Sequence, residues 1–180
     1  MSERRRRERK PPHPRFAGIR VDANFFHDTI PAEERAAADR LILLAEQMVL
    51  SIAIPHTVRR ELDHPNTPLS AQRRANRLVY TLDTGLGDRS RLDKVRQVMQ
   101  GNATPGRHHS DAAHLHDTAA WQAGYFVTCD GRILKKASEI TAAIGDIWIV
   151  RPTELAAIFD KYEGTEQRAP AAPEDDGAAG

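Results

Sequence analysis

The chain has 180 residues, 40% of them hydrophobic, which suits one domain with a buried core. Its single cysteine, Cys129, excludes an intramolecular disulfide and any zinc site that needs two or more cysteines. The net charge of +1 conceals a basic start, with +5 over residues 1–15, and an acidic end, with −4 over residues 163–180.

These features predict the organisation of the chain and its compartment. We expect a disordered basic arm at residues 1–16, a folded domain at 17–162 and a disordered acidic tail at 163–180. The arm could bind nucleic-acid phosphates or act only as a solubilising tail. No apolar run is long enough to span a membrane, and the start lacks the apolar segment of a secretion signal. Together with the lone cysteine, this predicts a cytoplasmic protein.

The first half of the chain alternates between strand and helix patterns. Short β-branched runs predict the strands, and apolar residues at helical spacing predict the helices. Pro55 suits the first position of a helix, because its fixed φ and missing N–H are tolerated there. We expect strands at 19–22 and 49–54, and helices at 32–48, from 55 onward, and at 70–82.

The second half continues the alternation. Ser110 is the predicted N-cap of a helix over residues 111–122. We also expect a helix at 90–99, a polar loop at 101–109, strands at 125–129 and 147–150, a mostly helical stretch at 133–143, and a last helix to about residue 162. Strands that alternate with helices predict an α/β fold, in which helices cover both faces of a mainly parallel sheet of four to five strands.

Four acidic residues stand out against this pattern. Asp22 and Asp130 each end an apolar strand-like run, and Glu61 and Asp111 lie on helix-like segments. Parallel sheets bind ligands outside the carboxyl ends of their strands, so we expect the four acids to meet there. Carboxylates brought together need a compensating cation, and oxygen ligands suit Mg²⁺ or Mn²⁺.

The segments around these acids resemble the four motifs of the PIN-domain ribonucleases. The resemblance covers residues 17–160, and each motif has the expected context at a strand end or early in a helix. The four segments are Val21-Asp22-Ala23-Asn24, Pro55-His56-Thr57-Val58-Arg59-Arg60-Glu61-Leu62, Ser110-Asp111-Ala112-Ala113 and Val127-Thr128-Cys129-Asp130-Gly131-Arg132-Ile133-Leu134.

The resemblance implies a three-layer α/β/α sandwich and a metal-dependent endoribonuclease that hydrolyses RNA phosphodiester bonds. Many relatives are VapC-like toxins, which implies an antitoxin protein and a homodimer as further partners. The chain is longer than the shortest such toxins, and its arm and tail are not hallmarks of the family.

We assign roles to the site residues on this basis. Asp22 and Asp130 are expected to bind Mg²⁺ or Mn²⁺ directly, and Asp111 directly or through water. Glu61 is expected to bind through water or to orient the attacking water. The remaining roles are positioning of the acids, for Asn24 and Thr128, and binding of substrate phosphate, for Arg132, His108 and His109.

Several alternatives remain open at this point. The domain could be a catalytically idle PIN-like module that binds RNA or a protein. It could instead be a phosphohydrolase with Asp22 as nucleophile, although such enzymes need a second aspartate where this chain has Asn24. DNA could replace RNA, because metals and phosphates do not distinguish the sugars. Finally, a cluster of histidines around Asp111 could bind zinc or iron; it comprises His108, His109, His114 and His116.

Overall fold

A computed structural model describes residues 10–83, 89–101, 108–145 and 147–166. Most of the predicted arm (1–9), most of the predicted loop (102–107) and most of the predicted tail (167–180) lie outside the described residues. Within the described ranges, no helix is both long and apolar enough to cross a membrane.

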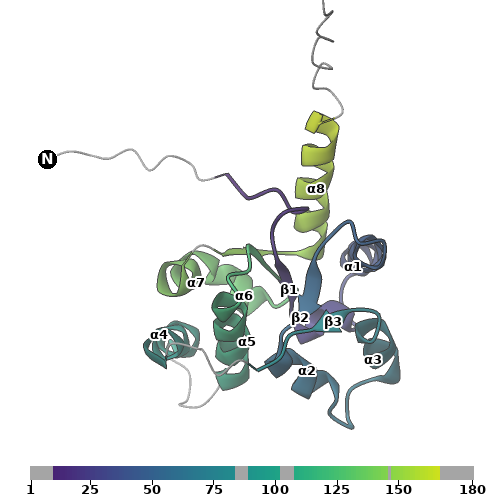
Figure 1. Cartoon of the computed structure of the whole chain (residues 1–180). Coiled ribbons are helices and arrows are strands. Elements are labelled where there is room, and N and C mark those ends of the chain that lie inside the picture. The colour runs from purple at the N-terminus through teal and green to yellow at the C-terminus, as the bar shows by residue number, and fades with distance from the viewer. Residues whose placement is uncertain (1–9, 84–88, 102–107, 146, 167–180) are drawn as a thin grey trace, which may run out of the picture.

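Five strands form one wholly parallel sheet in the order β3-β2-β1-β4-β5 (Figure 1). Ile19 of the central strand pairs with Ile52 on one side and with Tyr125 on the other. The chain runs outward from β1 to β3 and then returns to the other side, so the strand order reverses between β1 and β4. The strands are β1 (Ile19–Val21), β2 (Ile52–Ile54), β3 (Val79–Tyr80), β4 (Tyr125–Val127) and β5 (Trp148–Val150).

Helices cover both faces of this sheet, which confirms the predicted α/β sandwich (Figure 1). Every residue of β1, β2 and β4 is buried, as expected for strands covered on two sides. One face packs against α1 (Ala32–Glu46), α3 (Leu69–Ala75) and α8 (Pro152–Glu166). The other packs against α4 (Arg89–Gln100), α5 (His109–Ala120), α6 (Gly131–Lys135) and α7 (Ala137–Ile144).

Two short elements lie next to the carboxyl ends of the strands. The 3-10 helix η1 (Ala23–Phe26) follows β1 directly, and α2 (His56–Leu62) follows β2. Helix α2 contacts both η1 and α5. The segments that follow β1 and β2 are thereby held close to α5 at one end of the sheet.

The predicted helix over 70–82 is wrong in its second half. Helix α3 ends at Ala75, and Val79 and Tyr80 form the edge strand β3, which pairs with β2. The pairing continues beyond the strand, because the N–H of Thr81 donates to the carbonyl of Ile54 at 2.8 Å. The apolar residues here have helical spacing, but Val79 and Tyr80 are of types that favour strands, and their hydrogen bonding to β2 decides the structure.

The predicted N-cap at Ser110 is also wrong. Helix α5 begins two residues earlier than predicted, at His109, and His108 occupies the cap position with a left-handed φ of 73°. The His108 side chain lies over the first turn, with its Nδ1 3.2 Å from Oδ2 of Asp111. Ser110 therefore belongs to the first turn of the helix, where its hydroxyl is exposed.

The ends of the predicted domain are packed together. Helix α8 continues to Glu166, past the predicted boundary at residue 162. The described part of the predicted arm runs along this helix: the ring of His13 stacks on Tyr162, and Arg15 pairs with Glu163 at 2.8 Å. Residues 11–15 thus contact α8 at Tyr162 and Glu163.

Candidate active site

Asp22 lies where the strand order reverses. It follows β1, and its N–H donates to the Val127 carbonyl of the neighbouring β4 at 2.9 Å. The buried carboxylate accepts one hydrogen bond from the N–H of Ala23 at 2.8 Å and two from the side chains of Asn24 and Thr128. Open α/β sheets bind ligands at such a reversal, so Asp22 is fixed at the expected position.

Asn24 and Thr128 connect Asp22 to the end of β4. The hydroxyl of Thr128 donates to Asp22 at 2.7 Å and accepts from the N–H of Asp130 at 3.0 Å. The side-chain carbonyl of Asn24 accepts from the N–H of Cys129 at 2.9 Å. The two side chains thus hold the backbone that carries Asp130 in a set position relative to Asp22.

A buried imidazole lies between two of the acids. Nδ1 of His114 is 3.4 Å from Asp22, and its Nε2 is 3.4 Å from Glu61. The His114 side chain is only 3% exposed. Sequence reasoning gave His114 no role of its own, because it stood among several histidines. Its spacing of three residues from Asp111 puts both on one helix face and was the available signal.

A guanidinium lies between the other two acids. Arg132 covers the carboxylate of Asp130, with Nη2 at 2.6 Å from Oδ2, and the same nitrogen is 3.8 Å from Asp111. Arg132 also contacts His108, at 3.0 Å between Nη1 and Nδ1. Two of the side chains predicted to bind substrate are therefore in contact with the acids. The third, His109, is exposed at the start of α5.

The pKa values reflect this crowding of charge. Burial raises the pKa of Glu61, and the charges of Asp22 and Asp111 add to the shift against an opposing effect of His114. Burial likewise raises the pKa of Asp111, aided by Asp22 and opposed by Arg132. For Asp130, burial is outweighed by the hydrogen bonds and charge of Arg132, so its pKa is lowered. Glu61 and Asp111 thus carry negative charge that the protein compensates incompletely.

The same carboxylates also shift the pKa of His114. Burial alone would lower its pKa, but the hydrogen-bonding interaction with Asp22 and the charges of Asp22, Glu61 and Asp111 outweigh burial and raise it. Asp117, one turn further along α5, lies apart from this cluster and contacts His56 at 3.1 Å. The cluster therefore comprises four acids and two basic side chains that link them in pairs.

The donor set can be compared with the needs of a divalent cation. As the side chains stand, the described residues contain no group of three or more His, Cys, Asp or Glu that could hold a metal ion. Arg132 and His114 lie against the oxygens that a cation would use. The chemistry of the donors nevertheless fits Mg²⁺ or Mn²⁺, which prefer carboxylate oxygens. The Arg132 and Glu61 side chains are 56% and 52% exposed, so both have room to turn.

This competition predicts the effect of removing Arg132. We expect Arg132→Gln to tighten Mn²⁺ binding about fivefold, since one exposed ion pair contributes about 1 kcal/mol. Isothermal titration with MnCl₂ measures this directly. Lys135→Gln, at an exposed position of the same helix, is the matched control and should leave the affinity unchanged. Unchanged or weaker binding by Arg132→Gln would show that the guanidinium does not compete with the ion.

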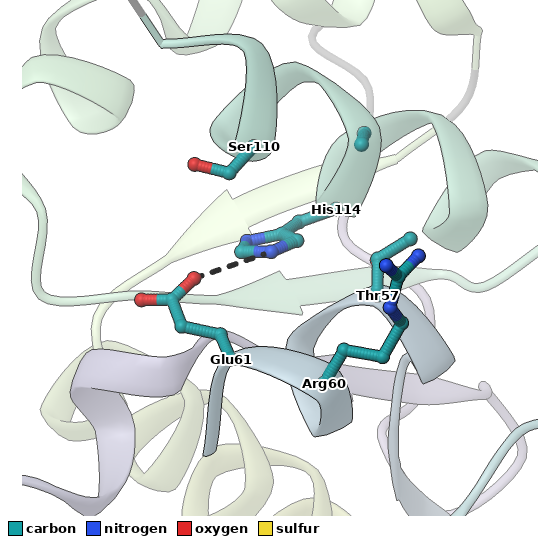
Figure 2. Close-up of a pocket in the computed structure, with 6 residues that line it drawn as sticks. Thr57, Arg60, Glu61, Ser110 and His114 are labelled. Atoms are coloured by element: carbon teal, nitrogen blue, oxygen red, sulfur yellow. Dashed lines mark ion pairs between the residues drawn. The ribbon is translucent and has the colours of Figure 1, made fainter. Parts of the chain in front are cut away.

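A pocket of about 440 Å³ lies beside the cluster, between α2 and α5. Figure 2 shows Glu61 and His114 paired across it, with Arg60 on the same helix as Glu61. Its lining residues are Thr57, Arg60, Glu61, Ser110, Ala113 and His114. The acid cluster is thus continuous with a space that a small group could enter.

Comparisons of this chain with protein-family models, curated proteins and solved structures found no match.

Proposed function

We propose that this chain is a metal-dependent endoribonuclease of the PIN-domain type. The observation that carries the proposal is the meeting of Asp22, Glu61, Asp111 and Asp130 at the reversal of strand order, linked by His114 and Arg132. Each acid comes from a different segment, and each belongs to one of the four motifs of the resemblance. An acid cluster assembled from four such segments is typical of sites that bind divalent cations for phosphodiester hydrolysis.

In this proposal each acid has a distinct role in the reaction. Asp22, Asp111 and Asp130 would hold the ion. The hydrogen bonds of Asn24 and Thr128 fix the position of Asp130 relative to Asp22. When bound, Mg²⁺ or Mn²⁺ neutralises charge on the phosphoryl oxygens and lowers the pKa of a coordinated water. Glu61 is the most exposed of the four acids and has a raised pKa, which suits it to orient the attacking water and accept its proton.

Two competing functions are less well supported. An Asp22 nucleophile would need a second aspartate two residues further on as its acid–base partner, and this position is Asn24, whose side chain is committed to Asp22 and the Cys129 backbone. A catalytically idle RNA- or protein-binding module would not need all four acids in one cluster. An antitoxin partner, a homodimer and a cytoplasmic location follow from the sequence and the resemblance and stay predictions.

Cleavage of a mixed panel tests the proposal. Structured RNA, single-stranded RNA and single-stranded DNA are incubated with Mn²⁺, with Mg²⁺ or with EDTA. We expect internal cleavage of RNA with either ion and none with EDTA. Cleavage that persists in EDTA, or an intact panel with folded, metal-loaded protein, would contradict it; the second result would favour the binding module.

A further inference from the structure

The pocket between α2 and α5 contains a cation that the acid cluster does not use. Arg60 makes no hydrogen bond or ion pair with any residue in the described part of the chain. The neighbouring arginine on the same helix is neutralised internally, because Arg59 pairs with Asp63 at 2.9 Å. Arg60 and Glu61 both line this pocket, and Figure 2 shows the guanidinium of Arg60 near Thr57 and the carboxylate of Glu61 paired with His114. An anion held by Arg60 would therefore lie in the space that Glu61 borders.

The rest of the pocket suits a ligand with polar and apolar parts. Thr57 and Ser110 contribute hydroxyl groups, and Ala113 contributes a methyl group. His114 lines the pocket with a buried side chain, and its Nε2 faces Glu61, another lining residue, at 3.4 Å. A volume of about 440 Å³ falls within the range of about 300–1,000 Å³ that is usual for small-molecule sites.

We propose that this pocket binds the nucleotide next to the scissile phosphodiester, with Arg60 pairing with its phosphate. The inference rests on the proposed nuclease function, because that function brings a polynucleotide chain across the acids. A planar guanidinium matches two phosphate oxygens at once, whereas the neighbouring carboxylates repel an anion. Arg60 would therefore hold the chain at one side of the cluster and leave the adjoining phosphodiester over the acids.

Binding in EDTA tests this without any need for cleavage. Fluorescence anisotropy follows a labelled single-stranded RNA as the wild type, Arg60→Gln or Arg73→Gln is added at several salt concentrations. Arg73 is the matched control, because it is exposed on α3 and does not line the pocket. We expect Arg60→Gln to weaken binding about tenfold. The slope of log K against log salt should become shallower by about 0.7, as for one lost phosphate contact on a single strand.

A second variant tests the pocket separately from its charge. Ala113→Leu fills the space without changing the net charge, so it should weaken binding and leave the salt slope unchanged. A single-stranded DNA of the same sequence should lose as much affinity as RNA in Arg60→Gln, because the contact is to phosphate.

Three outcomes would overturn the inference. The first is an equal loss of RNA affinity in Arg60→Gln and Arg73→Gln. The second is an Ala113→Leu variant that binds RNA as tightly as the wild type does. The third is a loss of affinity in Arg60→Gln for RNA but not for DNA. Loss of binding in the Arg60 and Ala113 variants without metal-dependent cleavage by the wild type would support the pocket and refute the nuclease. Metal-dependent cleavage by the wild type, together with unchanged RNA binding by Arg60→Gln, would support the nuclease and refute the pocket.

Discussion

Replacement of Asp22 by asparagine is expected to lower metal-dependent RNA cleavage by more than about a hundredfold, a loss typical of removing one electrostatic contact from a catalytic site. Asparagine keeps the size of the side chain and can still accept from Thr128, but it lacks the negative charge that would hold the ion. Asp130→Asn should have a similar effect, with the added loss of its pairing with Arg132. Initial rates on the best RNA of the panel, at saturating Mn²⁺, measure both.

The control for these variants is Asp160→Asn. Asp160 is an exposed aspartate on α8 that pairs with Arg40 on α1, away from the cluster. Its replacement removes the same charge and should leave cleavage unchanged. Full activity in Asp22→Asn, with a circular dichroism spectrum like that of the wild type, would refute the role given to the four acids.

The largest effect on stability is expected in the core behind the site. Phe126 lies at the centre of β4, is fully buried, and packs in the cluster formed with α4, α5, α6 and α7. Phe126→Ala should lower the free energy of unfolding by about 3–5 kcal/mol, because transfer from water and cavity formation both act against the variant. That is a large share of the roughly 5–15 kcal/mol that stabilises a typical domain.

Urea unfolding followed by circular dichroism measures this loss. Leu69→Ala is the control, because Leu69 is 68% exposed and its truncation should cost less than about 0.5 kcal/mol. If Phe126→Ala does not accumulate as folded protein, Phe126→Leu should show a smaller loss in the same direction. Equal losses at positions 126 and 69 would contradict the packing of this core.

Sequence reasoning located the elements that periodicity and composition define. The strands that lead to Asp22 and Asp130 are short, apolar and fully buried, so they gave strong signals. The edge strand β3 did not, because it has two exposed residues and exists through its pairing with β2. Local pattern cannot predict an element whose stability comes from a distant strand.

The same distinction holds in the site. Asp22 and Asp130 were predictable because each follows a strand, and Asp111 because it lies in the first turn of a helix. Glu61 was expected early in its helix but is the next-to-last residue of α2, and it reaches the cluster because α2 packs against α5. The contacts of His114 with Asp22 and Glu61, and of Arg132 with Asp130 and Asp111, depend on how separate elements are packed. Residue type and spacing do not determine such contacts, so Arg132 was expected to bind substrate and its pairing with the acids was missed.

The most direct test of this account is Mn²⁺ binding to the wild type and to Asp22→Asn, followed by electron paramagnetic resonance of the free ion. We predict saturable binding to the wild type and affinity at least about tenfold weaker in the variant, as for loss of a group that holds a metal site together. Equal binding by the two proteins, or no binding by the folded wild type, would contradict a metal centre at the carboxyl ends of β1 and β4.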